Sequence, residues 1–207
     1  MLKLIVFDCD GVMFDSREAN RRYYNDLLTA FSHPAMDEEE LSFVHMHNVT
    51  DSVNHIFRHY PREQLEEVHR YRLRLDYRPY LSSMIMEADL IDFLEFARNS
   101  YKLAISTNRT TTMRPLLQAF RLEGYFDKVV TAGDVARPKP APDALLDILT
   151  HFGCSAGQAI YIGDSLVDRQ HTEAVGVPLI AFKNPALPAE YHVDSFNQIR
   201  QLALFKR

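Results

Sequence analysis

Two carboxylates follow the first apolar stretch of the chain. Residues 4–7 read LIVF, an uninterrupted apolar run that is typical of a fully buried strand, and Asp8, Asp10 and Gly11 come directly after it. Two carboxylates this close resist joint ionisation unless a cation or a shared proton compensates for their charge. Asp-Gly is also common turn chemistry, so this segment alone fits an ordinary turn at least as well as a functional site.

Polar side chains follow three later segments as well. They are Thr107 with Asn108, Lys139 in a proline-rich loop, and Asp164 with Asp168. Each of them alone has a simpler interpretation as a helix cap or an exposed loop residue. Taken together with the first two acids, they supply carboxylates, a hydroxyl group and a cation at the carboxyl ends of the predicted strands, where open α/β sheets bind ligands. Phosphoryl transfer requires this combination: a nucleophile, oxygen ligands for a hard cation, and donors for the phosphoryl oxygens.

The elements that must position these residues alternate between strands and helices. After residues 4–7, strands are predicted at 101–105, 128–131, 159–162 and 177–182, and helices at 86–97, 112–121, 142–152, 165–175 and 195–205. Such alternation predicts a parallel sheet with right-handed crossovers. We therefore expect a doubly wound, Rossmann-like α/β core made of residues 1–15 and 80–207.

Residues 16–79 are predicted to form a helical insertion after the first strand. Residues that suit helix starts occur at Ser16, Asp37, Thr50 and Pro61. Residues 69–78, HRYRLRLDYR, alternate between apolar and charged residues as a strand does. Their position after a helix start favours a continued helix to about residue 77.

Composition narrows the classes of function. The formal net charge of −5 gives no reason to expect nucleic acid as a partner. Two cysteines suggest no disulfide framework, and no apolar run approaches the length of a membrane span. We expect a cytoplasmic protein without a membrane partner, either a monomer or a homodimer.

The polar segments resemble, in order, the four motifs of haloacid dehalogenase-superfamily phosphatases, in the branch that is similar to phosphoglycolate phosphatases. The motif D-x-D-G-x-x-x-D is matched by residues 8–15, and the strand that ends in Ser or Thr is matched at Thr107. The lysine of a K-P-x-P loop is matched by Lys139, and G-D-S-x-x-D by residues 163–168. Four spaced motifs across the core are a strong signal where any one alone would be weak.

The resemblance implies a role for each matched residue. Asp8 would attack phosphorus to form an aspartyl phosphate, and Asp10 would act as general acid and then general base, which requires a pKa raised relative to that of Asp8. The cofactor Mg²⁺ would be held by Asp8, Asp164 and the backbone carbonyl of Asp10. Thr107, Asn108 and Lys139 would bind or neutralise the phosphoryl group, and Asp168 would anchor the metal or Lys139.

The resemblance also implies that residues 16–79 form a mobile cap, hinged near residues 14–15 and 78–81, that selects the substrate. Candidate substrate contacts in this segment are Arg21, Arg22, His45, His47 and Asn48. The chain departs from the family pattern after the fourth motif, where His171 and Thr172 replace a pair of alanines that is often found there.

These observations predict a Mg²⁺-dependent phosphatase that acts on a small phosphorylated metabolite, of the phosphoglycolate type or a sugar phosphate. A phosphomutase of the same superfamily is an alternative, although the histidine usual five residues after the first motif is Asn20 here. A non-catalytic phosphate-binding or regulatory protein is an alternative of another class, although no residue of the four motifs is missing.

Overall fold

The protein is described by a computed structural model that covers residues 1–206. Its internal contacts divide the chain into two compact units. The core unit is formed by Met1–Asp15 and the chain from Met86 onward, and the helical unit is Ser16–Ile85. The sequence placed the second boundary at residue 79, but the 3-10 helix η1 (Arg78–Ser83) packs within the helical unit, where the Tyr80 hydroxyl donates to Asp26 Oδ2 at 2.7 Å.

The core unit is built on a six-stranded sheet in which every neighbouring pair of strands is parallel. The strands, in spatial order, are β5 (Lys128–Thr131), β4 (Lys102–Thr107), β1 (Leu4–Phe7), β6 (Ala159–Gly163), β7 (Leu179–Phe182) and β8 (Tyr191–Val193). The predicted doubly wound α/β fold is thereby confirmed. Strand β8 was missed because three residues are too short a segment for alternation to be recognised.

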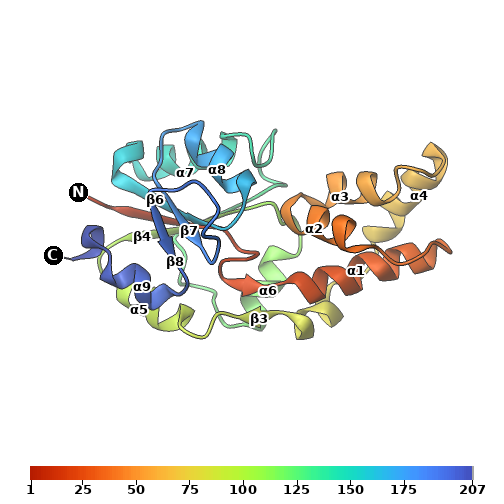
Figure 1. Ribbon diagram of the computed structural model, residues 1–207, viewed down its shortest axis with the longest axis horizontal. Coiled ribbons are helices and arrows are strands. Elements are labelled where there is room, and N and C mark those ends of the chain that lie inside the picture. The colour runs from red at the N-terminus through yellow and green to blue at the C-terminus, as the bar shows by residue number, and fades with distance from the viewer. Residues whose placement is uncertain (207) are drawn as a thin grey trace. The chain divides into compact units, whose positions relative to one another are not determined.

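Helices cover both faces of this sheet (Figure 1), which explains why β1 is apolar at every position. The helices α7 (Asp143–Phe152) and α8 (Leu166–Glu173) cover one face, and α5 (Leu90–Arg98) and α9 (Phe196–Gln201) cover the other. Leu4 and Val6 belong to the same core cluster as α7 residues. Phe7 points to the opposite face, where its ring lies 6.0 Å from that of Phe93 and 6.2 Å from that of Phe196.

The position of β1 brings distant segments together. Phe7 pairs with Ile105 on one side and with Ile162 on the other, so the residues that follow these three strands lie at one edge of the sheet. After β1 the next strand of this sheet is β4, on one side of β1, whereas after β6 the next strand is β7, on the far side of β6. The carboxyl ends of β1 and β6 therefore lie at the topological switch point of an open α/β fold. Helix α6 (Met113–Ala119) follows β4.

The helical unit contains four α-helices and η1. They are α1 (Arg17–Ala30), α2 (Glu38–Met46), α3 (Val49–Ile56) and α4 (Arg62–Arg72). The predicted continuation of α4 to residue 77 is wrong, since the helix ends at Arg72. Val68 is the one fully buried residue on α4, and Leu73 beyond its end is 73% exposed, so a longer helix would gain little from burial.

The remaining elements are short. They are β2 (Phe14–Asp15), β3 (Ile85–Met86), η2 (Ala156–Gln158) and η3 (Ala203–Phe205), of which β2 and β3 pair with each other. The helix predicted from residue 86 begins at Leu90, because Met86 lies in β3. Among residues 1–206, none of the helices combines the length and the apolar character that crossing a bilayer requires.

A capping box at the start of α2 gives a first test of how the helical unit is stabilised. Asp37 Oδ1 accepts from the Glu40 backbone N–H at 2.8 Å, and the Asp37 N–H donates to Glu40 Oε2 at 3.4 Å. We expect Asp37→Ala to lower the free energy of unfolding by about 1 kcal/mol, measured by chemical denaturation. Asp37→Asn keeps a capping acceptor and should change it by only a few tenths; an equal loss in both variants would contradict a role for the cap.

Candidate active site

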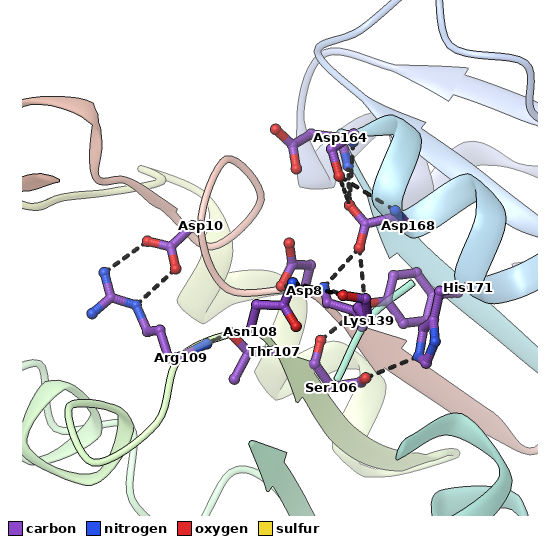
Figure 2. Close-up of polar contacts among 12 residues, drawn as sticks. Asp8, Asp10, Ser106, Thr107, Asn108, Arg109, Lys139, Asp164, Asp168 and His171 are labelled. Carbon is purple, nitrogen blue, oxygen red and sulfur yellow. Dashed lines mark hydrogen bonds and ion pairs between the residues drawn. The ribbon is translucent and has the colours of Figure 1, made fainter. Parts of the chain in front are cut away.

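Lys139 lies at the centre of the polar residues that gather at the carboxyl ends of β1, β4 and β6 (Figure 2). Its ammonium nitrogen is 2.8 Å from Asp8 Oδ1, 2.7 Å from Asp168 Oδ1 and 3.0 Å from the hydroxyl of Tyr161. An ammonium group has three N–H donors, and these three acceptors can use all of them. Lys139 therefore orients three protein groups in this structure.

Asp168 is held rigidly at the start of α8. Its Oδ2 accepts from the Ser165 hydroxyl at 2.7 Å and from the backbone N–H groups of Asp164 and Ser165, both at 3.2 Å. Its other oxygen accepts from Lys139 and from Tyr161. The side chain is fully buried, and both of its oxygens are committed to protein donors.

Gly11 allows Asp164 to approach the first motif closely. Its φ of +79° lies in the left-handed region, and a Cβ built at this position would lie 2.1 Å from Asp164 Oδ2. A residue other than glycine would therefore be strained and would also displace the carboxylate. The close approach of Asp164 to the first motif therefore requires a glycine at position 11.

Burial of several acids around one lysine raises the pKa of two of them. Burial, opposed by the charge of Lys139, raises the pKa of Asp8 to about 7. Burial and the neighbouring carboxylates of Asp168 and Asp8 raise the pKa of Asp164 well above its usual value. Burial opposes ionisation of Asp168 too, but Lys139 holds the pKa of that carboxyl below its usual value. Three ionised acids beside one ammonium would leave two uncompensated negative charges.

Oxygen atoms of Asp8, Asp164 and Asp168 all lie within 4.8 Å of one another. Because both oxygens of Asp168 are committed, Asp8 and Asp164 are the carboxylates best placed to bind a cation. Asp10 was predicted to contribute its backbone carbonyl, and its carboxylate does not belong to this group.

The side chain of Asp10 is directed toward Arg109 (Figure 2). The guanidinium donates from Nη2 to Asp10 Oδ1 at 2.7 Å and from Nε to Asp10 Oδ2 at 2.8 Å. A bidentate pair of this kind stabilises the ionised carboxylate. The structure thus gives Asp10 a charged partner that the sequence did not predict. Sequence analysis missed Arg109 because it stopped at the motif residue before it.

The two polar residues at the end of β4 hold the loops around them. Thr107 is buried, and its hydroxyl accepts from the Arg109 N–H at 3.1 Å. Asn108 Nδ2 donates to the carbonyl oxygen of Lys139 at 3.2 Å. The Oδ1 atom of Asn108 is buried without a hydrogen-bond partner among residues 1–206. The two predicted residues are thus adjacent, and their side chains hold the start of the next loop and the segment that carries Lys139.

Sequence analysis also missed a buried network behind Lys139. The Tyr161 hydroxyl is 2.9 Å from the carbonyl oxygen of Ser106, and His171 Nε2 is 3.1 Å from Ser106 Oγ. His171 Nδ1 is 2.7 Å from the carbonyl oxygen of Ala141. The one signal in the sequence was the replacement of a small family residue by His171.

The candidate substrate contacts of the helical unit have local partners within that unit. Arg21 pairs with Glu38, Arg22 donates to Ser83, His45 lies 3.2 Å from Asn20 Nδ2, His47 contacts the Phe43 carbonyl, and Asn48 caps α3. Each of them therefore has a structural role, which does not test their predicted role in substrate selection.

The fit between Gly11 and Asp164 can be tested by a single added methyl group. We expect Gly11→Ala to lower the free energy of unfolding by more than about 1–2 kcal/mol, since the left-handed backbone conformation alone costs that much and the contact with Asp164 adds to it. Gly157→Ala is the control, because nothing lies within 4 Å of the carbon added there. Equal denaturation midpoints for the two variants would contradict the close approach.

His171 should make stability depend on pH. Burial and the charge of Lys139 lower its pKa to about 4, compared with about 6.5 in an unfolded chain. Between these two pKa values the unfolded state binds a proton that the folded state does not. The contribution of His171 to the free energy of unfolding is therefore largest above about pH 6.5 and is lost as the pH falls toward 4. Between pH 6.5 and pH 4, the free energy of unfolding of the wild type should fall by about 3 kcal/mol relative to that of His171→Asn, measured by chemical denaturation. Parallel pH profiles of the two proteins would contradict this assignment.

Comparison with known proteins identifies the family. The family model of haloacid dehalogenase-like hydrolases matches residues 5–182. A haloacid dehalogenase-superfamily hydrolase of subfamily IA, variant 1, from Geobacter sulfurreducens PCA is 37% identical, with a TM-score of 0.85 over 97% of this chain and 99% of that chain. The phosphoglycolate phosphatase of Aliivibrio fischeri is 30% identical over 84% of this chain and 81% of that protein.

The similarity to other relatives is more local. The phosphoglycolate phosphatase of Escherichia coli K12 is 37% identical over 79 residues, which are 38% of this chain and only 31% of that protein. The resemblance predicted from the four motifs is nevertheless confirmed, because the family model covers residues 5–182, which include strands β4 to β7, most of β1 and all four motifs. The chain belongs to the haloacid dehalogenase-like hydrolase family.

Proposed function

We propose that this protein is a Mg²⁺-dependent phosphatase that hydrolyses a small phosphate monoester through an aspartyl phosphate. The observation that carries the proposal is the position of Asp8 at the end of β1, where Lys139 contacts one of its oxygens and Asp164 lies close by. Membership of a hydrolase family and similarity to phosphoglycolate phosphatases support it.

The residues present suit a hard divalent cation. The donors are carboxylate oxygens, which Mg²⁺ prefers, and full ionisation of the three acids would leave excess negative charge beside Lys139. Gly11 leaves the space beside Asp164 free of a side chain. Asp8, Asp164 and the backbone carbonyl of Asp10 would hold the ion. When bound, Mg²⁺ would neutralise this charge and polarise a phosphoryl oxygen.

Asp8 is the proposed nucleophile. Its ionised carboxylate forms a bond to phosphorus while the bond between phosphorus and the ester oxygen breaks. Lys139 favours the ionised form, against the effect of burial, and fixes one oxygen so that the other can face the substrate. Asp168 and Tyr161 hold the ammonium in place during this step.

Asp10 is the proposed general acid and base. It gives a proton to the departing ester oxygen, and it takes one from the water that then attacks the aspartyl phosphate, which releases phosphate and restores Asp8. The bidentate pair with Arg109 opposes the protonated form, so this pair must loosen before the first step. We propose that binding of the substrate brings this about.

The names of similar proteins support a proposal for the substrate class. Since similar proteins carry the name phosphoglycolate phosphatase, we propose a small phosphorylated metabolite of that type or a sugar phosphate. We further propose that the helical unit acts as a cap that excludes water and selects the substrate.

A hydrolysis screen tests this function. Wild-type protein is incubated with phosphoglycolate, sugar phosphates, nucleotides and phosphoserine, with Mg²⁺ or with a chelator, and released phosphate is measured. We expect Mg²⁺-dependent release, no release by Asp8→Asn, and a loss of about 10²–10⁴-fold in kcat for Asp10→Asn.

The matched control is Glu123→Gln, which removes an exposed carboxylate of the core unit and should retain full activity. Release that persists in Asp8→Asn would place the nucleophile elsewhere. No turnover of any ester by folded wild-type protein with Mg²⁺ would overturn the phosphatase and favour a non-catalytic phosphate-binding protein.

A further inference from the structure

We propose that His171 is a positioning residue of this site, which sets the loop that carries Lys139 against the end of β4. The proposal rests on the proposed phosphatase function. His171 lies on α8, and its ring nitrogens contact Ser106 and Ala141, neither of which is a candidate nucleophile or cation ligand. It acts through the two segments that its ring joins (Figure 2).

The ring of His171 bridges two elements that are far apart in sequence. Its Nε2 lies 3.1 Å from Ser106 Oγ on β4, and its Nδ1 lies 2.7 Å from the carbonyl oxygen of Ala141. His171 and Ser106 are both fully buried, so water does not compete for these hydrogen bonds.

The hydrogen-bond partners determine the tautomer. A carbonyl oxygen only accepts, so Nδ1 must carry the proton that it donates to Ala141. In the neutral ring Nε2 then accepts, and the hydroxyl of Ser106 donates to it. Burial and the nearby charge of Lys139 favour this neutral form, although Asp168 and Asp143 act in the opposite direction. His171 therefore connects the two elements without adding charge to the site.

The two anchored segments carry the residues that the proposed reaction uses. Ser106 directly precedes Thr107, and Ala141 follows Lys139 by two residues. On the other side, Asn108 holds the carbonyl oxygen of Lys139. The loop is thus fixed to the end of β4 by two side chains, Asn108 at Lys139 itself and His171 at Ala141.

Tyr161 links the same histidine to Lys139 a second time. The two rings meet edge to face with centroids 5.6 Å apart, and the Tyr161 hydroxyl lies 3.0 Å from the ammonium nitrogen. Removal of the imidazole would therefore release the loop and leave a cavity beside the tyrosine that orients Lys139. A small residue at this position, as in the family pattern, would provide neither the hydrogen bonds nor the ring contact.

A double-mutant cycle tests the proposal. Steady-state kinetics are measured for wild type, His171→Ala, Ser106→Ala and the double variant, on the best substrate of the hydrolysis screen. We expect His171→Ala to lower kcat about 10- to 100-fold with KM within about twofold, because small displacements of positioned groups cost rate. The losses of the two single variants should not add up, since both break the same contact.

Two further variants separate positioning from mere stability. Thr172→Ala removes a buried hydroxyl of the same helix that bonds only to helix carbonyl groups, so it should lower the melting temperature and leave kcat unchanged. His171→Asn offers an amide N–H near the position of Nδ1 and should recover part of the lost kcat.

The possible results distinguish the two proposals. Unchanged kcat in folded His171→Ala, or a loss equal to that of Thr172→Ala at equal stability, would overturn the positioning role while the phosphatase stands. Additive losses in His171→Ala and Ser106→Ala would also overturn it. Absence of turnover by wild-type protein would overturn the phosphatase and the positioning role together.

The tautomer of His171 is a test that does not depend on activity. Nitrogen-15 NMR of the imidazole should show the Nδ1–H tautomer; the Nε2–H tautomer would contradict the geometry.

Discussion

A buried ammonium group is the constraint around which the rest of the site is arranged. Lys139 is only 5% exposed, and an unpaired charge at such a position would be very costly. Its three acceptors come from β1, β6 and α8, so the lysine fixes the distances between these elements. Such a cluster is poor evidence for stability, because desolvation offsets much of the attraction. What the cluster provides is one fixed arrangement of Asp8 and Asp168 around the ammonium group.

The sequence predicted the parts of the structure that depend on local pattern. The run LIVF predicted a strand buried on both faces, and helices do cover both faces of β1. Motif spacing predicted that Asp8, Lys139, Asp164 and Thr107 would gather at one edge of the sheet, since parallel strands place their carboxyl ends together. The short strand β8 and the end of α4 at Arg72 could not be predicted in this way, because tertiary burial decides both.

Contacts between residues that are far apart in the sequence could not be predicted from local patterns. Arg109 and Asp10 are 99 positions apart, and Ser106 and His171 are 65 apart. No periodicity or local propensity connects such positions. The arginine forms an ion pair with Asp10, and the histidine stands where the family pattern has a small residue. Both differences concern how the motif residues are held, while the motif residues themselves were found.

The central place of β1 in the sheet has a consequence for how the chain folds. Phe7 has neighbours at Ile105 and Ile162, so this apolar strand is made before both of the strands that pair with it and must wait for them. Contacts of such high sequence separation slow folding and leave apolar surface exposed in the meantime. The helical insertion lengthens this wait, although the entropic cost of closing a longer loop rises only slowly with its length. The same topology that assembles the site thus keeps the apolar surface of β1 unpaired until late in synthesis.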